Sequence, residues 1–262
     1  MGELTDEVSE TIGYRCKVIL PAAHDTASAI LAMPSTDPDT VYISSGTWSL
    51  LGVELDAPDR SDSSRRNNFT NEGGFGGKTC YLTNIMGLWM IQSLRKELLE
   101  QCIELSFAEL CTLAERESIP SIIPCNHDRF LSPDSMIGEI QRACAESEQM
   151  VPQTPAQLAA VVYRSLAACY GEAVSQLRES RGKPYSSLSI IGGGSNAAYL
   201  NRLTAETTGC TVYVGPGEAT AIGNAAAQML SFGELGSVPE IRECVRRSFD
   251  VTVVQKSEIR KS

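Results

Sequence analysis

The stretch Ser187-Leu-Ser-Ile-Ile-Gly-Gly-Gly-Ser-Asn-Ala197 indicates the fold of this chain. Its apolar run, Leu188–Ile191, predicts a buried strand that meets three glycines and then a helical pattern. Glycine lets a ligand approach the backbone closely, and a helix N-terminus offers free N–H groups and a positive dipole end. Such a corner is typical of nucleotide-binding sites. It also occurs for packing alone, and the local pattern favours neither interpretation.

The elements on either side of this corner predict a mixed sheet. Thr154 followed by Pro155 starts a long helix that runs to about Ser180, and after the corner we expect a helix at 197–208 and a strand at 211–214. Further upstream, two strands flank a turn at Ser44–Ser49, and a second strand pair follows at 68–71 and 80–82. Three antiparallel strands in succession are therefore expected.

The turn at Ser44–Ser49 has two interpretations. Serine, glycine and threonine are ordinary turn residues, but N–H groups and hydroxyls that converge at such a tip can also bind phosphate. After the second strand pair, Asn84 is expected to cap a helix that runs to about Glu100, with Trp89 in the core.

A dinucleotide fingerprint also fits the glycine corner by spacing. Gly192, Gly194 and Ala197 match G-x-G-x-x-A, and Glu218 lies about 20 residues further on. A Rossmann unit, however, opens a domain and is followed by several more βα units, whereas one strand follows here. The order of elements instead favours an α/β fold of the ribonuclease-H-like (actin-like ATPase) kind, a mixed sheet flanked by helices. In that core the first hairpin turn holds phosphates and the glycine corner holds adenosine.

Composition excludes several classes of protein. The chain has 262 residues, 42% hydrophobic content and a net charge of −10, which indicates a globular protein and argues against a general nucleic-acid binder. Nine cysteines without CxxC pairs and only two histidines make a zinc cluster improbable and predict reduced, buried thiols. We find neither a membrane span nor a secretory signal, so we expect a cytoplasmic protein.

A polar trio, His24-Asp25-Thr26, stands at a predicted strand-to-helix junction. Asp25 can simply cap the small-residue helix that follows, or it can be a carboxylate aimed into a cleft as a general base, with His24 and Thr26 beside it on the substrate. For His127 beside Asp128, loop structure is favoured over catalysis. The turn at Pro34–Asp39 predicts a domain boundary, which divides the chain into 1–35 and 36–262.

Six blocks, weak singly but strong together and in this order, carry a resemblance to a known family. They are His24-Asp-Thr-Ala-Ser-Ala29, Ser44-Ser-Gly-Thr-Trp-Ser-Leu50, Thr70-Asn-Glu-Gly-Gly74, Asn84-Ile-Met-Gly-Leu-Trp89, Gly192-Gly-Gly194 with Leu200-Asn201, and Gly215-Pro-Gly-Glu-Ala-Thr-Ala-Ile-Gly-Asn224. The chain resembles the FGGY carbohydrate kinases over nearly its whole length. The first and fourth blocks favour the rhamnulokinase branch over xylulo-, glycero- and fuculokinases.

The resemblance implies ATP-dependent phosphorylation of L-rhamnulose at its 1-hydroxyl, with Mg²⁺. Asp25 would take the hydroxyl proton. The implied sugar contacts are His24, Asp25, Thr26 and Asn84. The implied nucleotide contacts are Thr47, which would hold phosphates, and Gln92 and Gly193.

The chain departs from this family in one respect. Members are about twice as long and open with a glycine-rich phosphate loop that carries an Asp, and no such loop occurs here. The resemblance therefore covers a C-terminal kinase domain at 36–262, preceded at 1–35 by the last part of the sugar-binding domain. We expect little kinase activity from this chain alone and a separate N-terminal half as its partner. The alternatives are a non-catalytic actin-like nucleotide-binding module and a kinase for another sugar, such as xylulose or fuculose.

Overall fold

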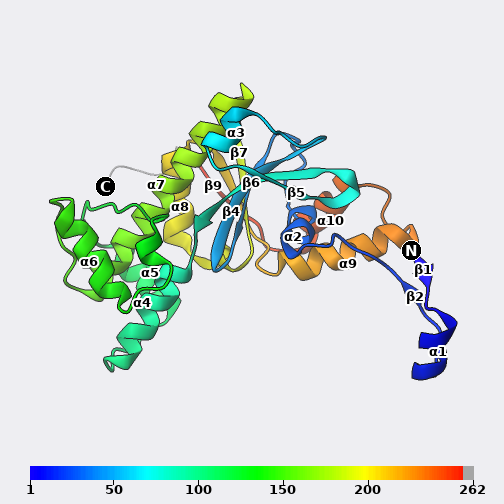
Figure 1. Ribbon diagram of the computed structural model, residues 1–262, viewed down its shortest axis with the longest axis horizontal. Coiled ribbons are helices and arrows are strands. Elements are labelled where there is room, and N and C mark those ends of the chain that lie inside the picture. Colours follow the sequence, from blue (N-terminus) through cyan, green and yellow to red (C-terminus); the bar gives the residue numbers. More distant parts are fainter. Residues whose placement is uncertain (256–262) are drawn as a thin grey trace.

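A seven-stranded mixed sheet organises the chain, as a computed structural model of residues 1–255 shows (Figure 1). The last seven residues of the predicted domain 36–262 lie outside the described residues. In spatial order the strands are β5 (Thr70–Gly73), β6 (Thr79–Met86), β4 (Trp48–Leu55), β3 (Val41–Ser45), β7 (Ser187–Ile191), β8 (Thr211–Val214) and β9 (Thr252–Val254). The predicted α/β class with a mixed sheet is confirmed.

The sheet has an antiparallel part, a parallel part and an edge strand, β9, that is antiparallel to β8. β3 to β6 form an antiparallel run, which confirms the three successive strands expected from the sequence. β7 then joins β3 in parallel, with Val41 opposite Leu188, and β8 continues the parallel part. The strand of the glycine corner thus lies beside the first strand of the hairpin, although the two are far apart in sequence.

Successive side chains along each strand point to opposite faces of the sheet, and each face carries its own hydrophobic core. Val41 and Ile43 join the larger core, whereas Tyr42 between them joins the smaller one. The larger core contains helices α4 (Trp89–Glu100), α5 (Phe107–Glu115), α6 (Met136–Glu146), α7 (Pro155–Arg181) and α8 (Ala198–Thr208). The smaller core contains α2 (Asp25–Leu31), α9 (Ala219–Phe232) and α10 (Val238–Ser248), on the other side of the sheet in Figure 1.

Short elements complete the chain. The N-terminal arm projects from the body in Figure 1 and consists of β1 (Gly2–Glu3), α1 (Asp6–Ile12) and β2 (Lys17–Val18). β2 pairs with β1 over only two residues. The remaining elements are α3 (Asp62–Arg66) and three 3₁₀ turns, η1 (Phe75–Gly77), η2 (Asp128–Phe130) and η3 (Gly193–Asn196).

The predicted cap at Asn84 is wrong, because Asn84 lies within strand β6, opposite Leu50. Helix α4 begins only at Trp89, and its N-cap residue Leu88 makes no side-chain cap. Instead, the N–H groups of Leu88 and Trp89 donate to the carbonyls of Gly46 and Thr47, at 3.0 and 3.1 Å. The β3–β4 turn therefore supplies the acceptors that a capping side chain would have supplied.

Helices α2 and α9 pack backbone against backbone. A Cβ atom built on Gly223 of α9 would lie 1.8 Å from the carbonyl oxygen of Ser28 on α2. The Thr220 hydroxyl of α9 also donates to the carbonyl of Asp25, at 3.4 Å. The small residues of α9 thus hold the helix that begins with Asp25.

We expect Gly223→Ala to lower the free energy of unfolding by at least about 2 kcal/mol, since the new methyl group collides with main-chain atoms that cannot rotate away. Helix propensity alone predicts the opposite sign, a gain of about 1 kcal/mol. Urea denaturation measures the difference, with Gly217→Ala as the control, because the nearest atom to a Cβ there is 3.6 Å away. A more stable Gly223→Ala protein would contradict this packing.

Candidate functional site

The turn between β3 and β4 joins three parts of the chain. The Gly46 N–H donates to the Trp48 carbonyl at 2.8 Å and closes the turn. The first turn of α4 is hydrogen-bonded to the same turn, because the Leu88 and Trp89 N–H groups donate to the Gly46 and Thr47 carbonyls. Gly87 must pass close beside the turn, because a Cβ on it would lie 2.5 Å from the carbonyl carbon of Trp48.

The glycine corner packs against the other side of this turn. Gly192 has a φ of +86°, and a Cβ on it would lie 2.9 Å from the Ser45 carbonyl oxygen. A Cβ on Gly194 would lie 1.9 Å from the Ser45 hydroxyl oxygen, whereas one on Gly193 would meet no atom within 4 Å. The two interpretations of the corner therefore apply to different glycines: the outer two are required by packing, and the middle one is open to a ligand.

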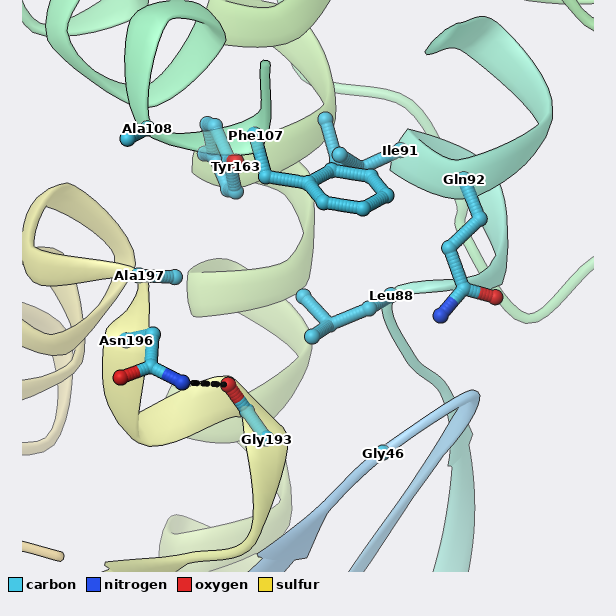
Figure 2. A pocket seen from close by; sticks show the side chains of 10 residues that line it. All are labelled: Gly46, Leu88, Ile91, Gln92, Phe107, Ala108, Tyr163, Gly193, Asn196 and Ala197. Carbon is cyan, nitrogen blue, oxygen red and sulfur yellow. Dashed lines mark hydrogen bonds between the residues drawn. The ribbon is translucent and has the colours of Figure 1, made fainter. Parts of the chain in front are cut away.

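A pocket of about 400 Å³ opens beside Gly193, between the corner and helices α4, α5 and α7 (Figure 2). It is lined by Gly46, Leu88, Ile91, Gln92, Phe107, Ala108, Tyr163, Gly193, Asn196 and Ala197. In Figure 2 the apolar side chains of Leu88, Ile91 and Phe107 lie across the pocket from Gly193 and Asn196. The Asn196 amide donates to the Gly193 carbonyl at 3.3 Å, which fixes its orientation.

The lining of this pocket suits a flat heteroaromatic group. Its walls are mostly apolar and aromatic, with the carboxamides of Gln92 and Asn196 and the hydroxyl of Tyr163 as polar groups and no charged side chain. Gln92 and Gly193, which the sequence placed in one nucleotide site, both line it. Thr47 does not, but it is exposed at the tip of the turn next to Gly46, which does.

The N-terminus of α2 forms a second candidate site. His24, not Asp25, is the N-cap residue, because its Nδ1 accepts a hydrogen bond from the Thr26 N–H at 3.2 Å. The capping alternative for Asp25 is therefore wrong: Asp25 is the first residue of the helix, and it is exposed. Thr26 is buried. Since the cap is made by its neighbour, the Asp25 carboxylate is left available.

Residues of the sheet lie on the same face as this helix end. A carboxylate oxygen of Glu72 on β5 lies 3.8 Å from Nδ1 of His24. Positions 80, 82 and 84 of β6 lie on the same face of the sheet. Cys80 and Leu82 belong to the core around α2, so the exposed Asn84 side chain faces the side of α2. The structure thus brings the His24, Thr70 and Asn84 blocks to one face of the sheet.

Sequence reasoning missed most of the pocket walls. Phe107 is the first residue of α5, and the capping box of Ser106 with Glu109 could have placed it there. Nothing in the pattern of α7 separates Tyr163 from a core residue. His127 accepts from the Arg129 N–H at 3.2 Å and caps η2, which agrees with the loop interpretation.

Residues 1–255 contain no group of three or more His, Cys, Asp or Glu side chains that could hold a metal ion. All nine cysteines are free thiols, and five of them are buried. No helix of this part of the chain is long and apolar enough to cross a membrane.

Comparison with known proteins identifies the family. Residues 41–232 match the C-terminal domain of the FGGY family of carbohydrate kinases, so the chain belongs to that family. Among curated proteins it is 43% identical over 256 residues to a rhamnulokinase of Oceanobacillus iheyensis, which covers 98% of this chain and 54% of the relative. It is 42% identical to a rhamnulokinase of Bacillus subtilis, over 94% of this chain and 50% of that protein. The chain spans about half the length of these relatives.

Solved structures agree on the fold. A gluconate kinase from Lactobacillus acidophilus superposes with a TM-score of 0.67 at 14% identity, covering 96% of this chain and 50% of that one. Plasmodium falciparum glycerol kinase with ADP gives a TM-score of 0.65 at 14% identity, over 98% and 51%. At such identities these likenesses show the fold alone, and the predicted actin-like ATPase fold is confirmed.

The two roles of the corner glycines predict different effects on stability. Gly194→Ala is expected to lower the free energy of unfolding by about 1–3 kcal/mol, because its methyl group overlaps Ser45. Gly193→Ala is expected to change it by less than about 0.5 kcal/mol, since its methyl group enters open space. Denaturation of the two variants side by side tests this assignment, and equal losses would contradict it.

Proposed function

We propose that this chain carries the nucleotide-binding part and the general base of a cytoplasmic, ATP-dependent kinase that phosphorylates L-rhamnulose at its 1-hydroxyl. The observation that carries the proposal is the 43% identity to a rhamnulokinase over 98% of the chain. This match includes both the glycine-corner pocket and the Asp25 segment. The pocket at the glycine corner and the N-terminus of α2, which belong to opposite faces of the sheet, thus lie in one matched region.

On the nucleotide side, adenine occupies the pocket between the apolar side chains of α4 and α5 and the backbone of Gly193. The carboxamides of Gln92 and Asn196 and the hydroxyl of Tyr163 are the side-chain hydrogen-bonding groups in its lining. The phosphates extend toward the β3–β4 turn, where the Thr47 hydroxyl is exposed. Gly193 is the residue at which the nucleotide approaches the main chain most closely.

On the sugar side, Asp25 accepts the proton of the attacking hydroxyl. The hydroxyl oxygen forms a bond to the γ-phosphorus of ATP, the bond from this phosphorus to the β–γ bridging oxygen breaks, and ADP leaves. Phosphoryl transfer of this kind depends mainly on position and charge neutralisation, to which Mg²⁺ contributes when it is bound. His24, Thr26 and Asn84 contact the sugar.

Two alternatives make different predictions. A non-catalytic nucleotide-binding module binds ATP in the same pocket but transfers no phosphate. A kinase for another ketose, such as xylulose or fuculose, transfers phosphate but prefers a different sugar. Both are separated from the proposal by an ADP-coupled assay with several ketoses, on this chain combined with the N-terminal half of the Bacillus subtilis relative. This combination is called the completed kinase below.

In the completed kinase we expect Asp25→Asn to lower kcat for L-rhamnulose by about 10²–10⁴-fold, the usual contribution of a general base. The dissociation constant of ADP, measured by calorimetry, should stay unchanged, because Asp25 lies at the end of α2 and does not line the nucleotide pocket. Full turnover by the variant would contradict the assigned base. Absence of turnover with every ketose, for the unsubstituted assembly, would favour the binding module.

For the nucleotide side we expect Gly193→Ala to raise the dissociation constant of ADP by about tenfold, since one methyl group then occupies the place of the ligand; tenfold corresponds to about 1.4 kcal/mol. Calorimetry on the 262-residue chain measures the constant, with Gly217→Ala as the control. Unchanged affinity in Gly193→Ala would exclude Gly193 from the site.

A further inference from the structure

Glu72 belongs to the Thr70–Gly74 block and has no role in the proposal so far. It lies on β5 opposite Cys80 of β6, so its side chain shares the sheet face that packs against α2. Its side chain is only 32% exposed. Glu54, on β4 and also near this core, forms an ion pair with the buried Arg242. Within residues 1–255 Glu72 accepts no hydrogen bond and pairs with no Lys or Arg, and its one side-chain contact of the ion-pair kind is with the imidazole of His24, whose Nδ1 lies 3.8 Å away.

His24 does not satisfy this carboxylate. Its Nδ1 already accepts the Thr26 N–H at 3.2 Å, so in the capped helix this nitrogen carries no proton. The proton of the neutral ring is therefore on Nε2, which makes no hydrogen bond in the described structure and belongs to a side chain that is 58% exposed. The cap of α2 thus fixes His24 as a hydrogen-bond donor through Nε2–H.

The Tyr42 hydroxyl does not satisfy Glu72 either. It is buried and has no hydrogen-bond partner among the described residues. Burial, and then the nearby Cys80, Glu54 and Glu72, raise the pKa of Tyr42 well above its usual value, so this group stays neutral. A partly buried carboxylate without a donor costs stability unless a ligand supplies one.

We propose that Glu72 is a further sugar-binding residue of this site. Its carboxylate accepts a hydrogen bond from one hydroxyl of the substrate, and a neighbouring hydroxyl accepts one from Nε2–H of His24. An unpaired acceptor beside a fixed donor matches a pair of adjacent hydroxyls, each of which can donate and accept. An anionic group is disfavoured by the carboxylate, and a cation by the N–H donor. The inference rests on the proposed sugar-kinase function and adds a specificity determinant to it.

The tautomer of His24 is tested first, on the chain without ligand. The protein has two histidines, and His127 makes the same kind of cap, with its Nδ1 accepting from the Arg129 N–H at 3.2 Å. In a histidine-labelled sample, ¹⁵N spectra at a pH where both rings are neutral should show Nε2–H for His24 and for His127, the internal control. A proton on Nδ1 of His24 would overturn the donor assignment.

The second test uses Glu72→Gln in the completed kinase. Because the substitution replaces a charged acceptor with a neutral carboxamide, which accepts a weaker hydrogen bond, KM for L-rhamnulose should rise about tenfold, while KM for ATP and the dissociation constant of ADP stay unchanged. The contrasting variant Glu54→Gln breaks the ion pair with Arg242 and should lower Tm without a selective rise in the KM for sugar.

The outcomes separate this inference from the function on which it rests. An unchanged KM for L-rhamnulose in Glu72→Gln, with normal turnover of the unsubstituted kinase, overturns the inference alone. An equal rise in the KM for sugar and for ATP assigns Glu72 a merely structural role and also overturns it. A completed kinase without turnover overturns the proposed function, and the inference with it.

Discussion

The turn at Ser45–Trp48 is the constraint on which both the sheet and the nucleotide pocket depend. It closes the β3–β4 hairpin, accepts the first two free N–H groups of α4, and leaves no room for side chains at Gly87, Gly192 or Gly194. Because interiors of proteins are close-packed, a shift of this turn would move α4 and the glycine corner together. The pocket lies between the corner and helices α4, α5 and α7, so the turn sets the spacing of two of its walls.

The sugar side depends on a separate contact. α2 is held by the close approach of Gly223 to Ser28 and by the hydrogen bond from Thr220 to the Asp25 carbonyl, while His24 caps its first turn. The carboxylate of Asp25 takes part in none of these contacts. Packing and capping are thus assigned to neighbours of Asp25, which leaves its side chain available for chemistry. The same division occurs at the corner, where Gly192 and Gly194 pack and Gly193 faces the pocket.

Local signals predicted much of the fold but little of the pocket. Thr154 and Pro155 mark the start of α7, and the strand before the glycines and the β3–β4 hairpin form where expected, because caps, turns and apolar runs involve adjacent residues. The prediction at Asn84 was wrong for the same reason. An Asn before an apolar helical pattern looks like an N-cap, whereas the acceptors for the first N–H groups of α4 belong to a turn more than forty residues upstream. Phe107 and Tyr163 meet only through tertiary packing of α5 on α7, which no local pattern contains. The order of the six sequence blocks compensated in part, since it identified Gln92 and Gly193 as neighbours that the structure brings to one pocket.

The most direct test of the account is amide hydrogen exchange of the 262-residue chain with and without ADP. A nucleotide held at the glycine corner should slow exchange at Gly193–Ala197, at the β3–β4 turn and at the start of α4, and leave the N-terminal arm at 1–20 unchanged. Protection confined to another part of the chain, such as the polar cavity of about 350 Å³ near Asn126 and Gln176, would contradict it. So would saturating ADP without any protection at Gly193.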